Sequence, residues 1–241
     1  MNLRAYRTFQ AMILAALGIY LLSKVYDGRI LLYINQRFVI LVLLAALGLL
    51  ALAQVVLRER PDVGSQAAEQ PAGRPGWALW LVVLPLLAGL LVPVRPLGVS
   101  ALANRGINTG AGLTARAGSS ALNSIEIPST QRSVLDWIRI SNDGNLAPGE
   151  MADVVGFVYH DGRLPENQFL VGRFSIACCV ADAVALGMVV SWPDAAGLPD
   201  NRWVRVAGPV QVYSLEGRNL PMIAAQRVEI IPEPEQPYLF P

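Results

Sequence analysis

The sequence has very few of the residues on which most enzymes and nucleic-acid-binding proteins depend. Its 241 residues include one histidine, one lysine (Lys24) and two cysteines. Two cysteines are too few for a disulfide framework, and a catalytic triad or Cys-His dyad would have to use His160. The chain has no Gly-x-Ser-x-Gly elbow and no Gly-x-x-x-x-Gly-Lys loop, the signatures of α/β-hydrolases and P-loop nucleotide hydrolases. We therefore predict that the protein is not an enzyme.

Charge is also scarce, and it is unevenly divided along the chain. Charged residues make up 15% of the sequence and apolar residues 54%, against about 25% and about 45–50% in ordinary soluble domains. Residues 1–130 hold 11 basic and 5 acidic side chains, whereas residues 131–241 hold 8 basic and 13 acidic ones. Binding to a phosphate backbone rests on lysine and arginine, so this acidic half predicts no nucleic-acid partner. The apolar excess favours membrane segments over one large core.

Three long apolar runs lie in the first hundred residues, at about 9–26, 38–57 and 77–94. A helix of about 20 apolar residues crosses a hydrocarbon core of about 30 Å, so we predict three spans in a lipid bilayer and a membrane region over residues 1–97. The first run is expected to be an uncleaved span, because no small-x-small cleavage site follows it. Pro85 is expected to kink the third run.

The flanking charges of these spans do not decide their orientation. Basic residues near the span ends are equally numerous on the two sides, five on each. The basic N-terminus favours a cytoplasmic start, and three spans would then place the C-terminal domain outside the cytoplasm. We predict a multi-pass protein of the cell membrane.

The remainder of the chain has a different character. Residues 98–130 are rich in Gly, Ala, Ser and Asn and are predicted to form a flexible linker. Residues 131–241 are predicted to fold separately, with a short amphipathic helix at 133–140 and five short strands. The strands are expected at roughly 151–159, 167–177, 184–191, 202–211 and 221–231. This pattern suits a small, mainly β barrel resembling the oligonucleotide/oligosaccharide-binding (OB) fold.

Both cysteines, Cys178 and Cys179, stand side by side, with Asp182 three residues further on. Together with His160 they would offer two sulfurs, one oxygen and one nitrogen to zinc or copper(I). Neighbouring side chains of an extended strand point to opposite faces, so joint ligation requires the strand to break at Cys178. Two alternatives stay open: core packing of the thiols, and a redox pair that forms a vicinal disulfide without the usual Cys-x-x-Cys spacing.

Two further residues are candidates for supporting roles near this pair. His160 ends a strand-like run just before Asp161-Gly162, where a histidine is more often a solvated surface residue than a ligand. Arg173 lies in the strand that leads to the cysteines. It is either an exposed strand residue or a cation that pairs with Asp182 or with an ionised thiol.

Four segments in this order resemble the YcgQ-like family of bacterial membrane proteins. They are Gly156-Phe-Val-Tyr-His160-Asp161, the stretch from Arg173 to Ala183, Trp203-Val-Arg-Val-Ala-Gly208, and Pro237-Tyr-Leu-Phe-Pro241. Members of that family are described as candidate subunits of a two-component membrane permease complex. The resemblance implies an integral-membrane permease subunit as partner, an accessory role, and a similar barrel fold. It includes the cysteine pair without saying what the pair does.

Overall fold

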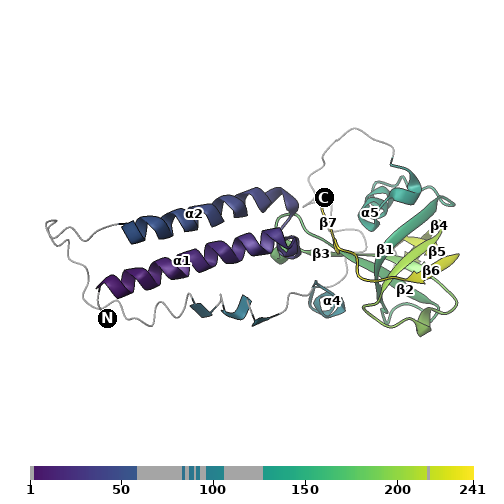
Figure 1. Cartoon of the computed structure of the whole chain (residues 1–241). Coiled ribbons are helices and arrows are strands. Elements are labelled where there is room, and N and C mark those ends of the chain that lie inside the picture. Colours follow the sequence, from purple (N-terminus) through teal and green to yellow (C-terminus); the bar gives the residue numbers. More distant parts are fainter. Residues whose placement is uncertain are drawn as a thin grey trace. The chain divides into compact units, whose positions relative to one another are not determined.

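The computed structural model of the chain describes residues 3–58, 83–84, 87–89, 91–92, 96–105, 127–215 and 218–241. The chain divides into two compact units, Met1–Arg95 and Pro96–Pro241. Figure 1 shows the helices of the first unit and the strands of the second. Each unit is described by itself.

The first unit contains two long helices, α1 (Leu3–Tyr26) and α2 (Val39–Arg58), connected through the short 3-10 helices η1 (Arg29–Leu32) and η2 (Gln36–Phe38). Both helices are long and apolar enough to cross a membrane, with mean hydropathies of 1.5 and 2.8. Only 17% of the first apolar window and 11% of the second is buried within the protein. A helix in the core of a soluble protein would be mostly buried, so a lipid environment suits these two helices better.

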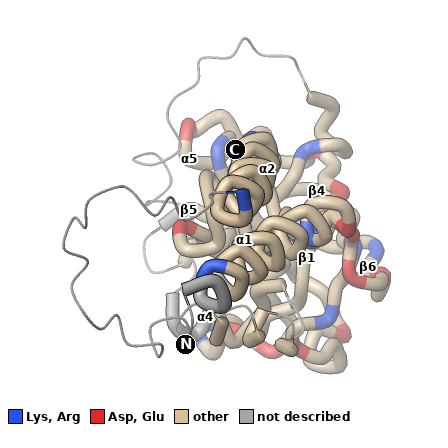
Figure 2. Tube along the Cα trace, turned by 60° about the vertical axis from the view of Figure 1, so that its left-hand side comes forward, with Lys and Arg blue, Asp and Glu red and all other residues tan. Residues whose placement is uncertain are grey.

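Charge is confined to the ends of these helices. Between Arg7 and Lys24, α1 carries no charged side chain, and α2 carries none before Arg58 (Figure 2). Small residues bring the two helices together: a Cβ atom on Gly18 would lie 2.9 Å from Cγ of Leu50. Close approach at small residues is how helices pack where lipid provides no hydrophobic drive between them.

The first two predicted spans are therefore helices of the expected kind. The third predicted span, residues 77–94, lies largely outside the described residues, together with Pro85. One described contact of this region joins it to α1: the hydroxyl of Tyr20 donates a hydrogen bond to the carbonyl oxygen of Gly89 at 2.8 Å. The structure thus supports two candidate spans.

The second unit is mainly β. Its strands are β1 (Met151–Tyr159), β2 (Gln168–Ser175), β3 (Val184–Ser191), β4 (Trp203–Leu215), β5 (Arg218–Ala224), β6 (Arg227–Ile230) and β7 (Tyr238–Leu239). The first five close into a barrel in the order β1-β2-β3-β5-β4, with β4 pairing back onto β1. Neighbours in this ring are antiparallel except β3 and β5, which are parallel. The predicted small five-stranded barrel is confirmed.

Several strand boundaries differ from the predicted ones: β4 continues to Leu215 instead of ending at 211, and β5 begins at Arg218 instead of 221. The single strand expected at 221–231 is two strands, because Ala225 donates its N–H to Ser191 while Gln226 donates to Ala207. The chain thereby leaves β3 and continues on β4 as β6. The strand expected to reach residue 177 ends at Ser175 instead.

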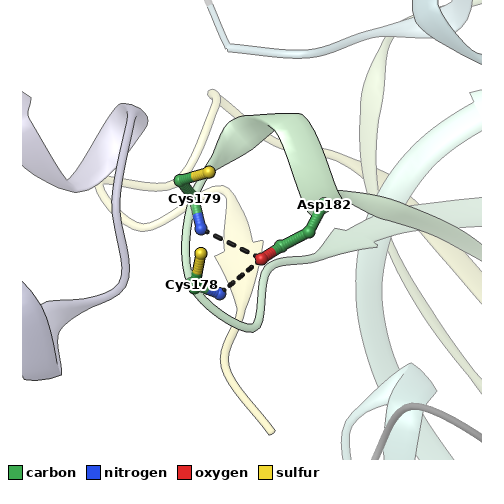
Figure 3. Close-up of side chains that lie close together, drawn as sticks. All are labelled: Cys178, Cys179 and Asp182. Carbon is green, nitrogen blue, oxygen red and sulfur yellow. Dashed lines mark hydrogen bonds between the residues drawn. The ribbon is translucent and has the colours of Figure 1, made fainter.

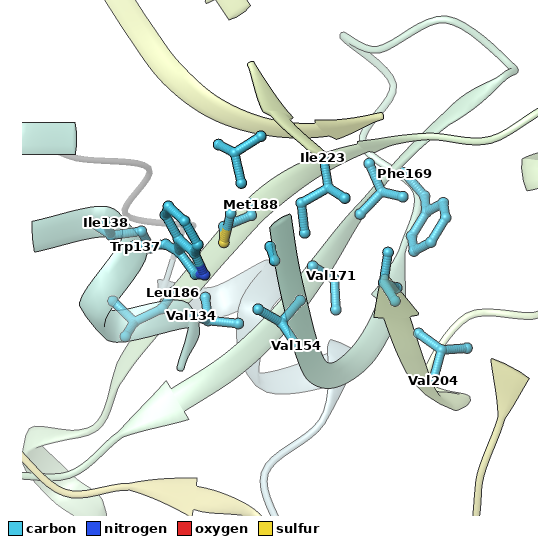
Figure 4. Packing of buried hydrophobic residues seen from close by; sticks show 14 of the residues in the cluster. Val134, Trp137, Ile138, Val154, Phe169, Val171, Leu186, Met188, Val204 and Ile223 are labelled. Carbon is cyan, nitrogen blue, oxygen red and sulfur yellow. The ribbon is translucent and has the colours of Figure 1, made fainter. Parts of the chain in front are cut away.

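Helix α5 (Val134–Asn142) covers the barrel core. Ser133 and Asp136 form a capping box at its start, in which the Ser133 side chain accepts from the Asp136 N–H and the Asp136 carboxylate accepts from the Ser133 N–H. Its apolar residues join the strands in one core cluster, shown in part in Figure 4 with Trp137 against Leu186 and Met188. The remaining described helices of this unit are short: α4 (Val99–Arg105), η3 (Ser129–Gln131), η4 (Val180–Asp182) and η5 (Ala195–Gly197).

Candidate functional site

The candidate site is the turn between β2 and β3, which holds both cysteines. The carboxylate of Asp182 accepts hydrogen bonds from three consecutive backbone amides. Oδ1 accepts from Ala177 at 3.0 Å. Oδ2 accepts from Cys178 at 2.7 Å and from Cys179 at 3.2 Å (Figure 3). In return the Asp182 N–H donates to the Cys179 carbonyl at 2.9 Å. The strand breaks here because one carboxylate gathers amides that would otherwise continue a ladder.

The break brings the two thiols to the same place. The sulfurs of Cys178 and Cys179 and a carboxylate oxygen of Asp182 all lie within 4.8 Å of one another. Both cysteines are free, Cys178 is exposed and Cys179 is half-buried. Because Cys178 is exposed, the alternative that both thiols serve as core packing does not apply to it. The strand is broken before Cys178, which is the condition that joint ligation by the two thiols sets.

The electrostatics of the turn keep Cys178 protonated. Its thiol donates a hydrogen bond to the Asp182 carboxylate, and this bond, with the nearby Cys179 and the negative charge of Asp182, raises the pKa of Cys178 to about 11. Burial alone would raise the pKa of Asp182, but the bonds from the Cys178 thiol and the three amides outweigh it and lower that pKa. A reactive thiol needs a lowered pKa, so Cys178 is poorly suited to act as a redox nucleophile at neutral pH.

His160 lies in a different part of the barrel unit. Its Nδ1 is 2.8 Å from Oδ1 of Asp200 and its Nε2 is 3.0 Å from the carbonyl oxygen of Ala195. Among the described residues it does not belong to the group formed by the cysteines and Asp182. It lines a cavity of about 500 Å³ that includes Glu166, Gln168 and Asp200. The sequence offered no signal for Asp200, which is 40 residues away along the chain.

Arg173 holds the C-terminal segment. Its Nη2 donates to the Gln236 carbonyl at 2.6 Å and its Nε to the Pro237 carbonyl at 3.2 Å. Its guanidinium also lies over the Trp203 ring, 5.8 Å from the centroid. Burial lowers the pKa of Arg173. The described contacts of this side chain thus fasten the segment that forms β7, and they include no bond to Asp182.

Both units match models of known protein domains. Residues 9–108 match the model of the DUF1980 N-terminal domain, and residues 127–241 match that of the DUF1980 C-terminal domain. The chain belongs to the DUF1980 family. The YcgQ-like resemblance is thereby confirmed, and the cysteine turn lies within the DUF1980 C-terminal domain.

Two curated proteins are similar to this DUF1980 chain. UPF0703 protein YcgQ of Bacillus subtilis is 29% identical over 94 residues, which are 38% of this chain and 33% of that protein. A Streptococcus mutans protein, named as a candidate subunit of a two-component membrane permease complex, is 28% identical over 90 residues, 36% of this chain and 32% of that protein. The DUF1980 chain thus matches about a third of the length of each relative.

Proposed function

We propose that the chain is a non-enzymatic accessory subunit of a membrane permease complex. The observation that carries this proposal is the pair of apolar helices whose surfaces are left largely uncovered within the protein. Residues that form an ion or substrate pathway through a membrane are commonly ionisable, and α1 and α2 carry charge only near their ends. The name of the Streptococcus mutans relative supports the same role. An integral-membrane permease subunit would supply the pathway, and α1 and α2 would pack against it in the bilayer.

The proposed organisation keeps three parts. Residues 1–97 form the membrane region, and residues 131–241 form the barrel domain outside the cytoplasm. Residues 98–130 are the linker between these two parts. The five-stranded ring, with its parallel contact between β3 and β5, supports an OB-like barrel. Barrels of this kind present loops and strand faces for binding, which suits a domain that binds or delivers a ligand at the mouth of a permease.

A second candidate function is a membrane-anchored metal-binding or thiol-redox module that uses Cys178 and Cys179. The convergence of two sulfurs and a carboxylate within 4.8 Å favours metal binding. The raised pKa of Cys178 disfavours the redox version. The two functions are compatible if the cargo of the permease is itself a metal ion.

Purification from native membranes tests the accessory role. A tagged chain, extracted in mild detergent, is expected to bring with it a polytopic permease subunit in a fixed ratio, identified by mass spectrometry and its own hydropathy. A chain with Cys178→Ser and Cys179→Ser is expected to recover the same partner, because the contact is assigned to the spans. Recovery of the chain alone, or loss of the partner in the double variant, would argue against an accessory subunit held by its helices.

The two native cysteines also allow a test of the three-span topology. A membrane-impermeant maleimide added to intact cells is expected to label the barrel through Cys178, the exposed thiol. In the double serine background, Gln36→Cys places a single thiol at an exposed position in η2, between α1 and α2. Three spans put this position and the barrel on the same side, so labelling of both from outside is expected.

The same labelling distinguishes two spans from three. If only two helices cross, the η2 position and the barrel lie on opposite sides, and only one of the two chains is labelled before the cells are opened. The double serine chain without Gln36→Cys must stay unlabelled. Labelling at a mildly alkaline pH compensates for the raised pKa of Cys178.

A further inference from the structure

The turn at the end of β2 presents two thiols, side by side, on an exposed surface. We propose that Cys178 and Cys179 bind one copper(I) ion through their two sulfurs alone, and that Asp182 shapes the turn without being a ligand. The binding itself depends only on the geometry of the turn. The use made of it, delivery of the ion to the partner subunit, rests on the accessory role proposed above.

Asp182 is occupied within the turn. A carboxylate offers about four acceptor positions in the plane of its two oxygens. Three are taken by the N–H groups of Ala177, Cys178 and Cys179, and these bonds remain when the thiols lose their protons. Turning this carboxylate toward a metal would release backbone amides from their acceptor. Its role is therefore to hold the two cysteines in register, and the ligand set is reduced to two sulfurs.

Two sulfurs suit copper(I) better than zinc. Zinc sites are almost always four-coordinate, and among the described residues no histidine, cysteine or further acidic side chain joins this group. Thiolates are soft ligands that bind copper(I) as well as zinc, so it is the small number of ligands that disfavours zinc here. With metal–sulfur bonds of about 2.3 Å, two sulfurs on opposite sides of an ion lie about 4.6 Å apart. The ligand atoms of the group lie within 4.8 Å of one another, so both sulfurs are close enough to reach one ion.

Binding exchanges protons for the ion and involves no change of oxidation state. Two S–H bonds break, two copper–sulfur bonds form, two protons pass to water, and the resulting bis-thiolate complex carries one negative charge. Metal binding that displaces protons is pH-dependent. Because two protons leave as the ion binds, the affinity for copper(I) is expected to fall as the solution is acidified.

The exposure of the turn favours transfer of the bound ion over its permanent retention. Structural metal sites are closed by four protein ligands, whereas Cys178 is exposed and only two sulfurs hold the ion. A third sulfur from another protein can approach the ion and displace one thiolate at a time. This is the behaviour expected of a site that receives and passes on its ion. For an accessory subunit, the receiving ligands would belong to the permease.

The test uses the full-length chain in detergent, reduced and kept anaerobic. Copper(I) is offered in competition with bicinchoninate, a coloured copper(I) chelator, and zinc is titrated in parallel. We expect one copper(I) per chain, two sulfur neighbours by X-ray absorption, and weaker binding of zinc. Cys178→Ser and Cys179→Ser should each weaken copper(I) binding at least about 100-fold, the upper end of the effect of losing a supporting group. Unchanged circular dichroism of the variants shows that folding is retained.

The outcomes separate this site from the accessory role. Zinc held more tightly than copper(I), affinity unchanged in either serine variant, or no retention of copper(I) against the chelator would each overturn the site. If the chain recovers the permease partner in the purification above but binds no copper(I), the accessory role stands and the copper(I) site is rejected. If the chain binds copper(I) but recovers no partner, the copper(I) site stands and delivery to a permease is rejected.

Discussion

Replacing Trp137 with alanine is expected to lower the free energy of unfolding of the barrel unit by about 3–5 kcal/mol, the range for loss of a large aromatic side chain from a core. Trp137 is 0% exposed and lies among the apolar residues that α5 adds to the strands. Leu186 and Met188 of β3 lie close to its ring (Figure 4). Truncation leaves a cavity between the helix and the barrel, and α5 has only nine residues, too few to fill it by shifting. The midpoint of denaturant unfolding, followed by circular dichroism of the full chain, measures this loss.

Trp137→Phe provides the matched control. The indole Nε1 is buried and has no hydrogen-bond partner among the described residues, so removing it sacrifices no bond within that part of the chain. The phenyl ring also preserves an aromatic face for the Arg132 guanidinium, which lies 5.0 Å from the Trp137 ring centroid. We expect the phenylalanine variant to lose less than about half as much stability as the alanine variant. An equal loss would mean that the indole N–H, rather than the ring, stabilises this contact.

The barrel could be predicted from the sequence because its signals are local. Short β-branched runs between turn residues marked all five strands of the ring, and the amphipathic pattern at 133–140 marked α5. The division of the last predicted strand was not visible, because its apolar pattern runs through the point where the chain changes partner. Only the hydrogen bonds of Ala225 and Gln226, one to each neighbour, reveal that change.

The site was only partly predictable, for a related reason. Cys178, Cys179 and Asp182 are close in sequence, and the structure brings them together. The turn that does so contains neither glycine nor proline, the usual signals of a break. It depends on one carboxylate that accepts three amides. The partners of Arg173 and His160 are 63 and 40 residues away, a separation at which sequence spacing carries no information about contact.

Asp182→Ala is expected to disrupt the turn and, with it, copper(I) binding. The Ala177, Cys178 and Cys179 amides lose their acceptor, and loss of bonds to a charged group costs about 1.5–3 kcal/mol of local stability. Without the carboxylate, the sulfurs are no longer held on one side of the turn. We expect copper(I) affinity to fall about 10–100-fold although Asp182 is not a ligand, as for other groups that position ligands. Bicinchoninate competition measures the affinity, and hydrogen exchange measures the protection of the three amides.

Acid should reproduce part of this effect in the unchanged chain. The pKa of Asp182 is lowered in the folded protein, so the carboxylate stabilises the turn fully above the ordinary carboxyl pKa of about 3.9. That contribution is lost as the pH falls through the lower, folded-state pKa. Protection of the three amides should therefore persist to a pH below the usual carboxyl range and then disappear. In Asp182→Ala it should be absent at neutral pH as well.

Asp200→Ala is the control for this prediction, because it removes a carboxylate of the same unit that contacts His160 instead of the cysteine turn. Copper(I) affinity and the protection of the Cys178 and Cys179 amides should stay unchanged in it. Equal losses in both aspartate variants would show a general weakening of the barrel rather than a local one. Full copper(I) affinity in Asp182→Ala would mean that the two thiols converge without the carboxylate, and the positioning role assigned to Asp182 would have to be abandoned.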